Sequence, residues 1–90
     1  MISIPSGLVD QFINEFGKDD QIDILQEECA ELIQACSKAK RGYLNHDNLK
    51  EEMSHVTLSM AVVAKIYGIS EFDIVEEVNK KCDKYGFENI

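Results

Sequence analysis

The apolar residues between Asp20 and Gly42 recur at alternating spacings of three and four positions. On an α-helix this spacing forms one stripe, the kind of surface through which the helices of a bundle contact one another. Acidic residues early in the segment and cations at its end suit the dipole of a helix that starts after Asp19 or Asp20. The predicted stripe consists of Ile22, Leu25, Cys29, Leu32 and Cys36. The segment therefore predicts a long helix that must bury one side against another helix.

Helical spacing recurs elsewhere in the chain, whereas the period-two alternation of a half-buried strand is nearly absent. A short first helix is predicted over about residues 5–16, with Gly17 ending it. A last helix is predicted from Ser70, which can cap it together with Asp73, to Gly86. Both segments carry apolar residues on one side and therefore need a partner surface.

A third helix is predicted over roughly residues 49–67, between the loop GYLNHDN and Gly68. Asn45 or Asp47 in that loop can cap it. Its predicted stripe consists of Leu49, Met53, Val56, Met60, Val63 and Tyr67. Because this helix is apolar on most sides after its first two turns, we expect it to lie at the centre of the protein.

An all-α fold follows from these segments. A chain of 90 residues has room for one core, so residues 1–90 are predicted to form a single domain. A helical hairpin with one very apolar helix leaves surface to cover. We therefore expect a bundle of about four helices per chain, completed by homo-oligomerisation.

The chain is acidic, with a formal net charge of −8. Binding to nucleic acid or to an anionic membrane requires clustered Lys and Arg, so neither partner is expected. Three cysteines without a CxxC motif indicate small buried hydrophobes in a reducing compartment. The N-terminal stretch MISIPSGLVDQ lacks the pattern of a signal peptide, and no run is long enough to span a membrane. We expect a cytoplasmic protein.

Two acidic clusters lie on the second and third predicted helices. Glu28 and Glu31 are one turn apart, and Glu52 and His55 have the same relation. If the two helices pack antiparallel, as a short loop requires, these four side chains can converge, and carboxylates so close together favour a bound cation. The alternative is a pair of solvated helix edges, since glutamate is common in helices and favourable near their starts.

The stretches EECAE and EEMSH resemble the paired acidic signature of the MazG-like all-α nucleoside triphosphate pyrophosphohydrolases. That signature is EExxE on one helix and ExxD on the next. The similarity continues through IQACSKAKRG and EEMSHVTLSMAVVAKIYGIS and covers roughly residues 16–85. It implies Mg²⁺-dependent hydrolysis of a nucleoside triphosphate, between the α- and β-phosphates, by a homodimer or homotetramer.

The resemblance also implies roles for individual residues. The family's metal-binding positions correspond to Glu28, Glu31 and Glu52, and His55 stands where the family has Asp. The base that activates water would be Glu27 or Glu31. Side chains near the C-terminal helix would bind phosphates, or else form a solvated helix end. They are Asn79, Lys80, Lys81 and Lys84.

The histidine at position 55 leaves the occupant of the site open. Mg²⁺ prefers oxygen ligands, whereas imidazole suits Mn²⁺ or another transition metal better. The site could therefore hold Mg²⁺ on glutamates alone, prefer a softer metal, or have lost catalysis. Two other functions fit the same residues. One is a dimeric di-metal bundle with carboxylate and histidine ligands, and the other is a catalytically silent binding or regulatory module.

Overall fold

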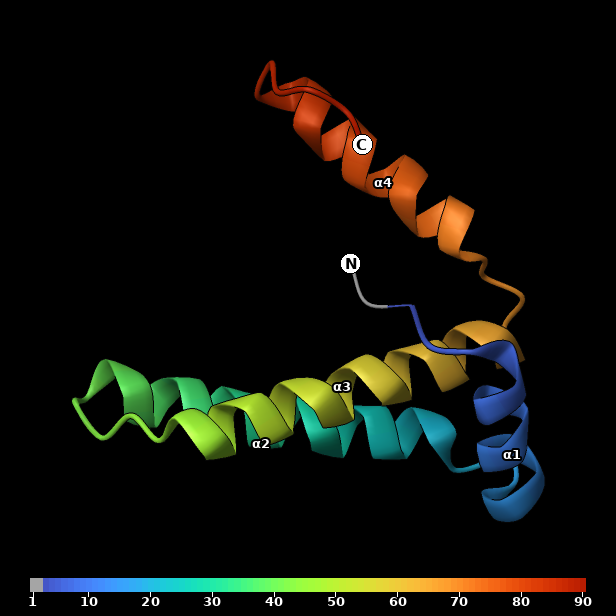
Figure 1. Cartoon of the computed structure of the whole chain (residues 1–90), viewed down its shortest axis with the longest axis horizontal. Coiled ribbons are helices and arrows are strands. Elements are labelled where there is room, and N and C mark those ends of the chain that lie inside the picture. The colour runs from blue at the N-terminus through green and yellow to red at the C-terminus, as the bar shows by residue number, and fades with distance from the viewer. Residues whose placement is uncertain (1–2) are drawn as a thin grey trace.

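The computed structural model describes residues 3–90, which form helices and connecting segments without a strand. The helices are α1 (Ser6–Phe16), α2 (Gln21–Lys40), α3 (His46–Ile66) and α4 (Glu71–Lys84). Figure 1 shows α2 and α3 lying side by side as a long hairpin, with α1 crossing one end of it and α4 leaving at an angle. The predicted all-α class and the four predicted helices are confirmed.

The third helix begins earlier than the sequence predicted. It starts at His46 rather than near Leu49, because the Asn45 side chain accepts a hydrogen bond from the Asn48 backbone N–H at 3.0 Å. Asn45, and not Asp47, is therefore the capping residue of α3. The loop between α2 and α3 is correspondingly short, and a short loop requires the two helices to run antiparallel.

The sides of α2 and α3 that face each other match the predicted stripes only in part: Leu25, Cys29 and Leu32 of α2 are half-buried and Val56 of α3 is buried. On α2, Ala35 is buried, whereas Ile22 and Cys36 are exposed. On α3, the predicted stripe residues Met53, Met60 and Tyr67 are 54%, 52% and 62% exposed. The buried residues of α3 are instead Glu52, Val56, Ser59 and Val62. Both the predicted and the observed set of α3 residues follow spacings of three and four. The prediction favoured the set with fewer polar side chains.

Gly42 follows the last turn of α2 and ends the helix. Gly42 has a φ of 84°, a left-handed conformation that costs a residue with a Cβ more than it costs glycine. The Tyr43 N–H donates to the Lys38 carbonyl at 2.8 Å, and the Gly42 N–H donates to the Ala39 carbonyl at 3.2 Å. This pair of bonds is a Schellman motif, which satisfies carbonyls left free at the helix end.

Gly42→Ala is expected to lower the free energy of unfolding by about 1 kcal/mol, because alanine is strained at positive φ. Gly7→Ala is the matched control, since Gly7 lies inside α1 with open space around it. It is expected to be neutral or to stabilise the protein by roughly 0.5 kcal/mol. Urea unfolding followed by circular dichroism measures both. Equal effects of the two substitutions would contradict the assigned turn.

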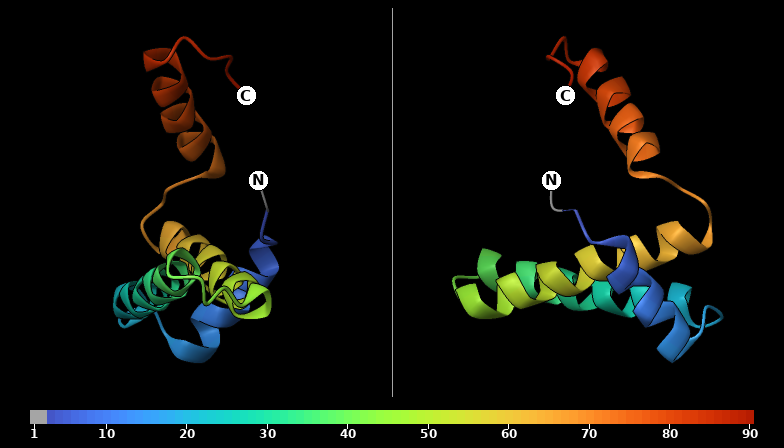
Figure 2. Two further views of the ribbon diagram at one scale, coloured as in Figure 1. Left: turned by 90° about the vertical axis from the view of Figure 1, so that its left-hand side faces the viewer. Right: turned by 45° about the vertical axis from the view of Figure 1, so that its right-hand side comes forward.

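The first helix packs across α3, where Val9 is buried. α4 has the predicted capping box: the Ser70 side chain accepts from the Asp73 N–H, and Asp73 accepts from the Ser70 N–H. Beyond this cap, α4 packs against none of the other three helices, and Figure 2 shows it standing clear of them in both views. The chain thus consists of a three-helix body with α4 projecting from it.

The hydrophobic core of this body is small. Within residues 3–90 the buried apolar side chains are Val9, Ala35, Val56 and Val62, and Val62 is the one most deeply buried. Many large apolar side chains are exposed instead, including Met53 and Met60 on α3. None of the helices described is both long and apolar enough to cross a lipid bilayer.

Candidate metal centre

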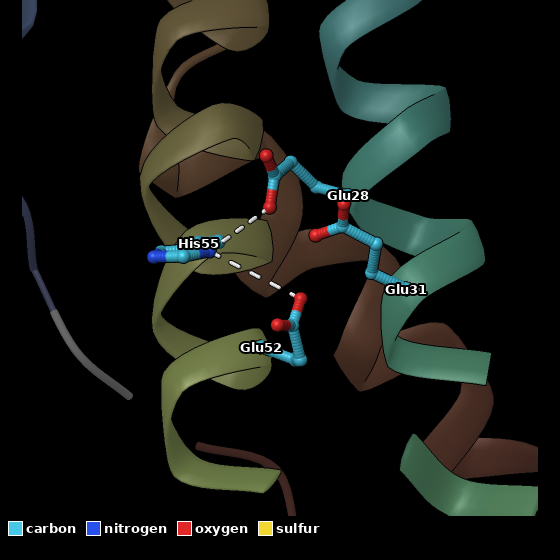
Figure 3. Close-up of side chains that lie close together, drawn as sticks. All are labelled: Glu28, Glu31, Glu52 and His55. Carbon is cyan, nitrogen blue, oxygen red and sulfur yellow. Dashed lines mark ion pairs between the residues drawn. The ribbon is translucent and has the colours of Figure 1, made fainter. Parts of the chain in front are cut away.

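The antiparallel hairpin brings the two acidic clusters together. Glu28 and Glu31 project from α2 toward Glu52 and His55 on α3, and the four side chains meet between the helices (Figure 3). One ligand atom from each of the four lies within 4.8 Å of the others. The convergence predicted for an antiparallel pair is therefore confirmed, and the cluster is more than two unrelated helix edges.

The four residues of this cluster differ in how deeply they are buried. The Glu52 residue is 8% exposed and Glu28 is half-buried, whereas the His55 side chain is 43% exposed. Glu31 is exposed. The predicted stripe of α3 did not include Glu52, but the observed register of α3 directs this residue into the helix interface. Glu52 thus lies at the buried end of the cluster, and the side with Glu31 and His55 is open to solvent.

Two carboxylate oxygens in the cluster have no hydrogen-bond partner among the described residues. They are Glu28 Oε2 and Glu52 Oε2, and both are buried. The Nδ1 atom of His55 lies 3.2 Å from Glu28 Oε2 and 4.0 Å from Glu52 Oε2. These approaches are ion pairs when the imidazole is protonated, but they do not satisfy either oxygen as hydrogen bonds do. Buried polar atoms without partners are rare in folded proteins, and a bound ion is one recognised reason for them.

Electrostatics in the cluster are unfavourable to Glu52 as a free carboxylate. Burial raises the pKa of Glu52 above its ordinary value, and the neighbouring carboxylate of Glu31 raises it further. His55 lowers the pKa of Glu52, and Glu28 raises it. The chain therefore holds a carboxylate where its charge is poorly compensated by its own residues.

The other predicted site residues lie outside this cluster. Glu27 is exposed on α2 and is not part of the converging set. On α4, the Asn79 side-chain amide is engaged by the C-terminal residue: Asn79 Oδ1 accepts from the Ile90 N–H at 2.9 Å. Lys80 pairs with Glu77 at 2.9 Å. Lys81 and Lys84 are exposed and have no ion pair in the part of the chain that is described.

Comparison with known proteins identifies the family to which this chain belongs. The model of a family described as the MazG nucleotide pyrophosphohydrolase domain matches residues 16–87. The chain belongs to this family. Neither the curated proteins nor the solved structures that were searched returned a match. The resemblance noted from EECAE and EEMSH is thereby confirmed, and the match covers α2, α3 and α4 of this MazG domain.

The donor set of the MazG domain fits a divalent cation. Three carboxylates and one imidazole are all metal ligands in proteins, and a cation would compensate the charges that the chain leaves unbalanced. The two orphaned oxygens on Glu28 and Glu52 would gain a partner. Ser59, two turns beyond Glu52 on α3, is also buried and was not among the predicted site residues. Its spacing of seven from Glu52 was the available signal.

Lowering the pH from 7 toward 4.5 is expected to stabilise the MazG domain in the presence of a chelator. Because the folded-state pKa of Glu52 is raised, the folded chain binds more protons than the unfolded chain between the ordinary value of 4.5 and the raised one. The stabilisation that protonated Glu52 contributes is complete below the ordinary pKa and is lost as the pH rises through the folded-state pKa. Melting temperatures measured across this range test it, with Glu52→Gln as the control that should flatten the slope. A melting temperature that rises with pH, or a slope unchanged in the variant, would contradict the assignment.

Proposed function

We propose that this MazG domain is a metal-dependent nucleoside triphosphate pyrophosphohydrolase, which releases a nucleoside monophosphate and pyrophosphate. The observation that carries the proposal is the convergence of four side chains, each with one ligand atom within 4.8 Å of the others. Two buried carboxylate oxygens in this cluster, Glu28 Oε2 and Glu52 Oε2, lack a hydrogen-bond partner among the described residues. The family match supports nucleotide chemistry at this cluster. Glu28, Glu31, Glu52 and His55 would hold the metal ion.

The remaining chemistry is assigned to carboxylates of α2. A divalent cation held by the cluster would neutralise charge on the triphosphate and polarise the α-phosphorus. Glu31 is the exposed carboxylate at the open side of the cluster, where a water molecule can reach it. It would orient that water toward the α-phosphorus and accept its proton as pyrophosphate leaves. Glu27 is the second candidate base and lies one turn away on the same helix.

The phosphates of the nucleotide would be bound by cationic side chains of α4. Lys81 and Lys84 are free of ion pairs in the described residues, which suits them to this role better than Lys80. Asn79 would contribute its amide only if its contact with Ile90 opens. Because α4 stands apart from α2 and α3 of its own chain, these residues would act on a nucleotide held by the cluster of another copy.

Self-association is part of this proposal, with a second copy of the same chain as the partner. Four buried apolar residues are a small core for a chain of this length, and chains with small cores commonly gain stability by association. A groove of about 410 Å³ runs between α1, α3 and the start of α4, lined by apolar residues that include Met60, Ala61 and Ile74. The side chains of Phe72 and Val78 on α4 are exposed, and α4 packs against no other helix in the described part of the chain. These surfaces would cover one another in a homodimer or homotetramer.

Pyrophosphate release from a panel of ribo- and deoxyribonucleoside triphosphates tests the proposed reaction. We expect release that requires an added divalent cation and falls to background when a chelator removes it. The product pair should be monophosphate and pyrophosphate, not diphosphate and phosphate. A folded, helical protein that releases no pyrophosphate with Mg²⁺ or Mn²⁺ would contradict the proposal. Iron uptake with an oxo-bridge absorption band would then favour the di-metal bundle, and its absence a binding module.

A further inference from the structure

The donor set of the cluster contains one nitrogen. Glu28, Glu31 and Glu52 contribute oxygens, and His55 contributes the Nδ1 atom of its imidazole. We propose that His55 Nδ1 is a direct metal ligand, so that the centre binds a transition-metal dication such as Mn²⁺, Co²⁺ or Zn²⁺ in preference to Mg²⁺. This inference rests on the proposed function in one respect: it names the cation of the same site.

The orientation of the imidazole supports direct ligation. Figure 3 shows the Nδ1 edge of the ring directed at the carboxylates of Glu28 and Glu52, while the other ring nitrogen points away from the cluster. Nδ1 is bonded to Cγ, as a carboxylate oxygen of an aspartate is, so it lies at nearly the same distance from the helix backbone. A histidine at this position can therefore present nitrogen where an aspartate would present oxygen.

The two distances from His55 Nδ1 to the carboxylates fall in the range of ligands that share one ion. Donors at about 2.1 Å from a shared dication lie roughly 3 Å apart when adjacent and roughly 4 Å apart when opposite. His55 Nδ1 is 3.2 Å from Glu28 Oε2 and 4.0 Å from Glu52 Oε2. Both oxygens are buried and lack hydrogen-bond partners in the described chain, and the Glu52 residue is 8% exposed. An unpartnered, buried carboxylate aimed at the imidazole is the arrangement expected of two ligands that share an ion.

The chemistry of the donors then decides which ion is preferred. Mg²⁺ demands oxygen ligands and loses its water reluctantly, whereas imidazole suits the transition-metal dications. Replacing a carboxylate by a neutral imidazole also removes one negative charge from the site, which weakens the attraction for a hard cation most. Both effects act in the same direction and lower the affinity for Mg²⁺ relative to Mn²⁺, Co²⁺ or Zn²⁺.

Two measurements on the full chain test the proposal, with Mn²⁺ as the probe. Pulsed electron paramagnetic resonance of bound Mn²⁺ reports a directly coordinated nitrogen through its ¹⁴N coupling. Calorimetric titration gives the ratio of the dissociation constants for Mg²⁺ and Mn²⁺. The variants are His55→Asp, which restores an oxygen donor, and His46→Gln, the matched control, since His46 is exposed at the start of α3 and outside the cluster. His55→Asn, a neutral oxygen donor, replaces His55→Asp if that variant loses its helical circular dichroism.

We expect ¹⁴N coupling in the unaltered protein and in His46→Gln, and none in His55→Asp. The Mg²⁺-to-Mn²⁺ ratio is expected to fall by about tenfold in His55→Asp and to stay unchanged in His46→Gln. Bound Mn²⁺ without ¹⁴N coupling, an unchanged ratio in His55→Asp, or no Mn²⁺ binding would each overturn the assignment.

These two measurements separate the metal assignment from the proposed hydrolase function, because neither the ¹⁴N coupling nor the ratio of dissociation constants depends on turnover. If ¹⁴N coupling is lost in His55→Asp but the protein releases no pyrophosphate, His55 is supported as a metal ligand and the proposed hydrolase function is overturned. Pyrophosphate release that is fastest with Mg²⁺, in a protein whose bound Mn²⁺ shows no ¹⁴N coupling, would do the reverse.

Discussion

Glu52→Gln is expected to lower pyrophosphate release by at least about 100-fold while the four helices stay intact. Glu52 is the most buried member of the cluster, and its Oε2 atom has no hydrogen-bond partner among the described residues, so a cation bound there would satisfy it. A neutral amide of the same shape keeps the packing between α2 and α3 but removes the negative charge that we propose holds the metal ion. Turnover with Mg²⁺ and with Mn²⁺ measures the loss, and circular dichroism checks the helices.

The matched control is Glu51→Gln, the same substitution one position earlier, at an exposed residue outside the cluster. It is expected to leave turnover within about twofold of the unaltered protein. In the absence of metal, Glu52→Gln should also unfold at a higher temperature, because desolvation and the neighbouring carboxylates disfavour the charge of Glu52. Full turnover in Glu52→Gln would show that the reaction does not depend on this cluster.

Two inactive variants are expected to restore activity when they are combined in one oligomer. One variant is Glu52→Gln, and the other carries Lys81→Glu and Lys84→Glu on α4. If α4 of one copy serves the cluster of the other, a mixed dimer has one damaged site and one intact site. Random assembly of dimers makes half of them mixed, so the recovered activity should be about a quarter of that of the unaltered protein. The two proteins are mixed in denaturant and refolded together, and light scattering gives the oligomeric state.

The control for charge is Lys38→Glu with Lys40→Glu, which makes the same change at the exposed end of α2. This variant is expected to keep most of its turnover by itself. Separately refolded variants that are mixed only in the assay should recover nothing unless they exchange subunits. A monomer by light scattering, or an oligomer in which the combined variants stay inactive, would contradict a site shared between copies.

The ligand set of the candidate site was predictable because it depends on local spacing. Glu28 with Glu31, and Glu52 with His55, lie one turn apart on any α-helix, and a short loop makes the two helices antiparallel. Their convergence therefore needed no knowledge of the rest of the fold. The burial of Glu52 could not be read in the same way, because it depends on which side of α3 meets α2.

The interface between α2 and α3 shows why hydrophobic spacing alone was insufficient. The stripe through Met53 and Met60 and the stripe through Glu52 and Ser59 differ by one position, and both have the spacing of a helix seam. A monomer would be expected to bury the apolar stripe. The chain instead buries Glu52 and Ser59 along with Val56 and Val62, which leaves the methionines exposed. This arrangement is expected if the interface builds a metal centre and the methionines contact another copy.

The sequence by itself determined the all-α class, the capping box of α4, the glycines that follow the helices, and the four side chains that converge at the candidate site. All of these follow from interactions within a few residues, where side-chain chemistry and backbone geometry leave few choices. Only the tertiary structure decided the register of α2 against α3, the burial of Glu52 and the separation of α4 from the other helices. These depend on free-energy differences between alternative packings of the same helices, which local spacing does not distinguish.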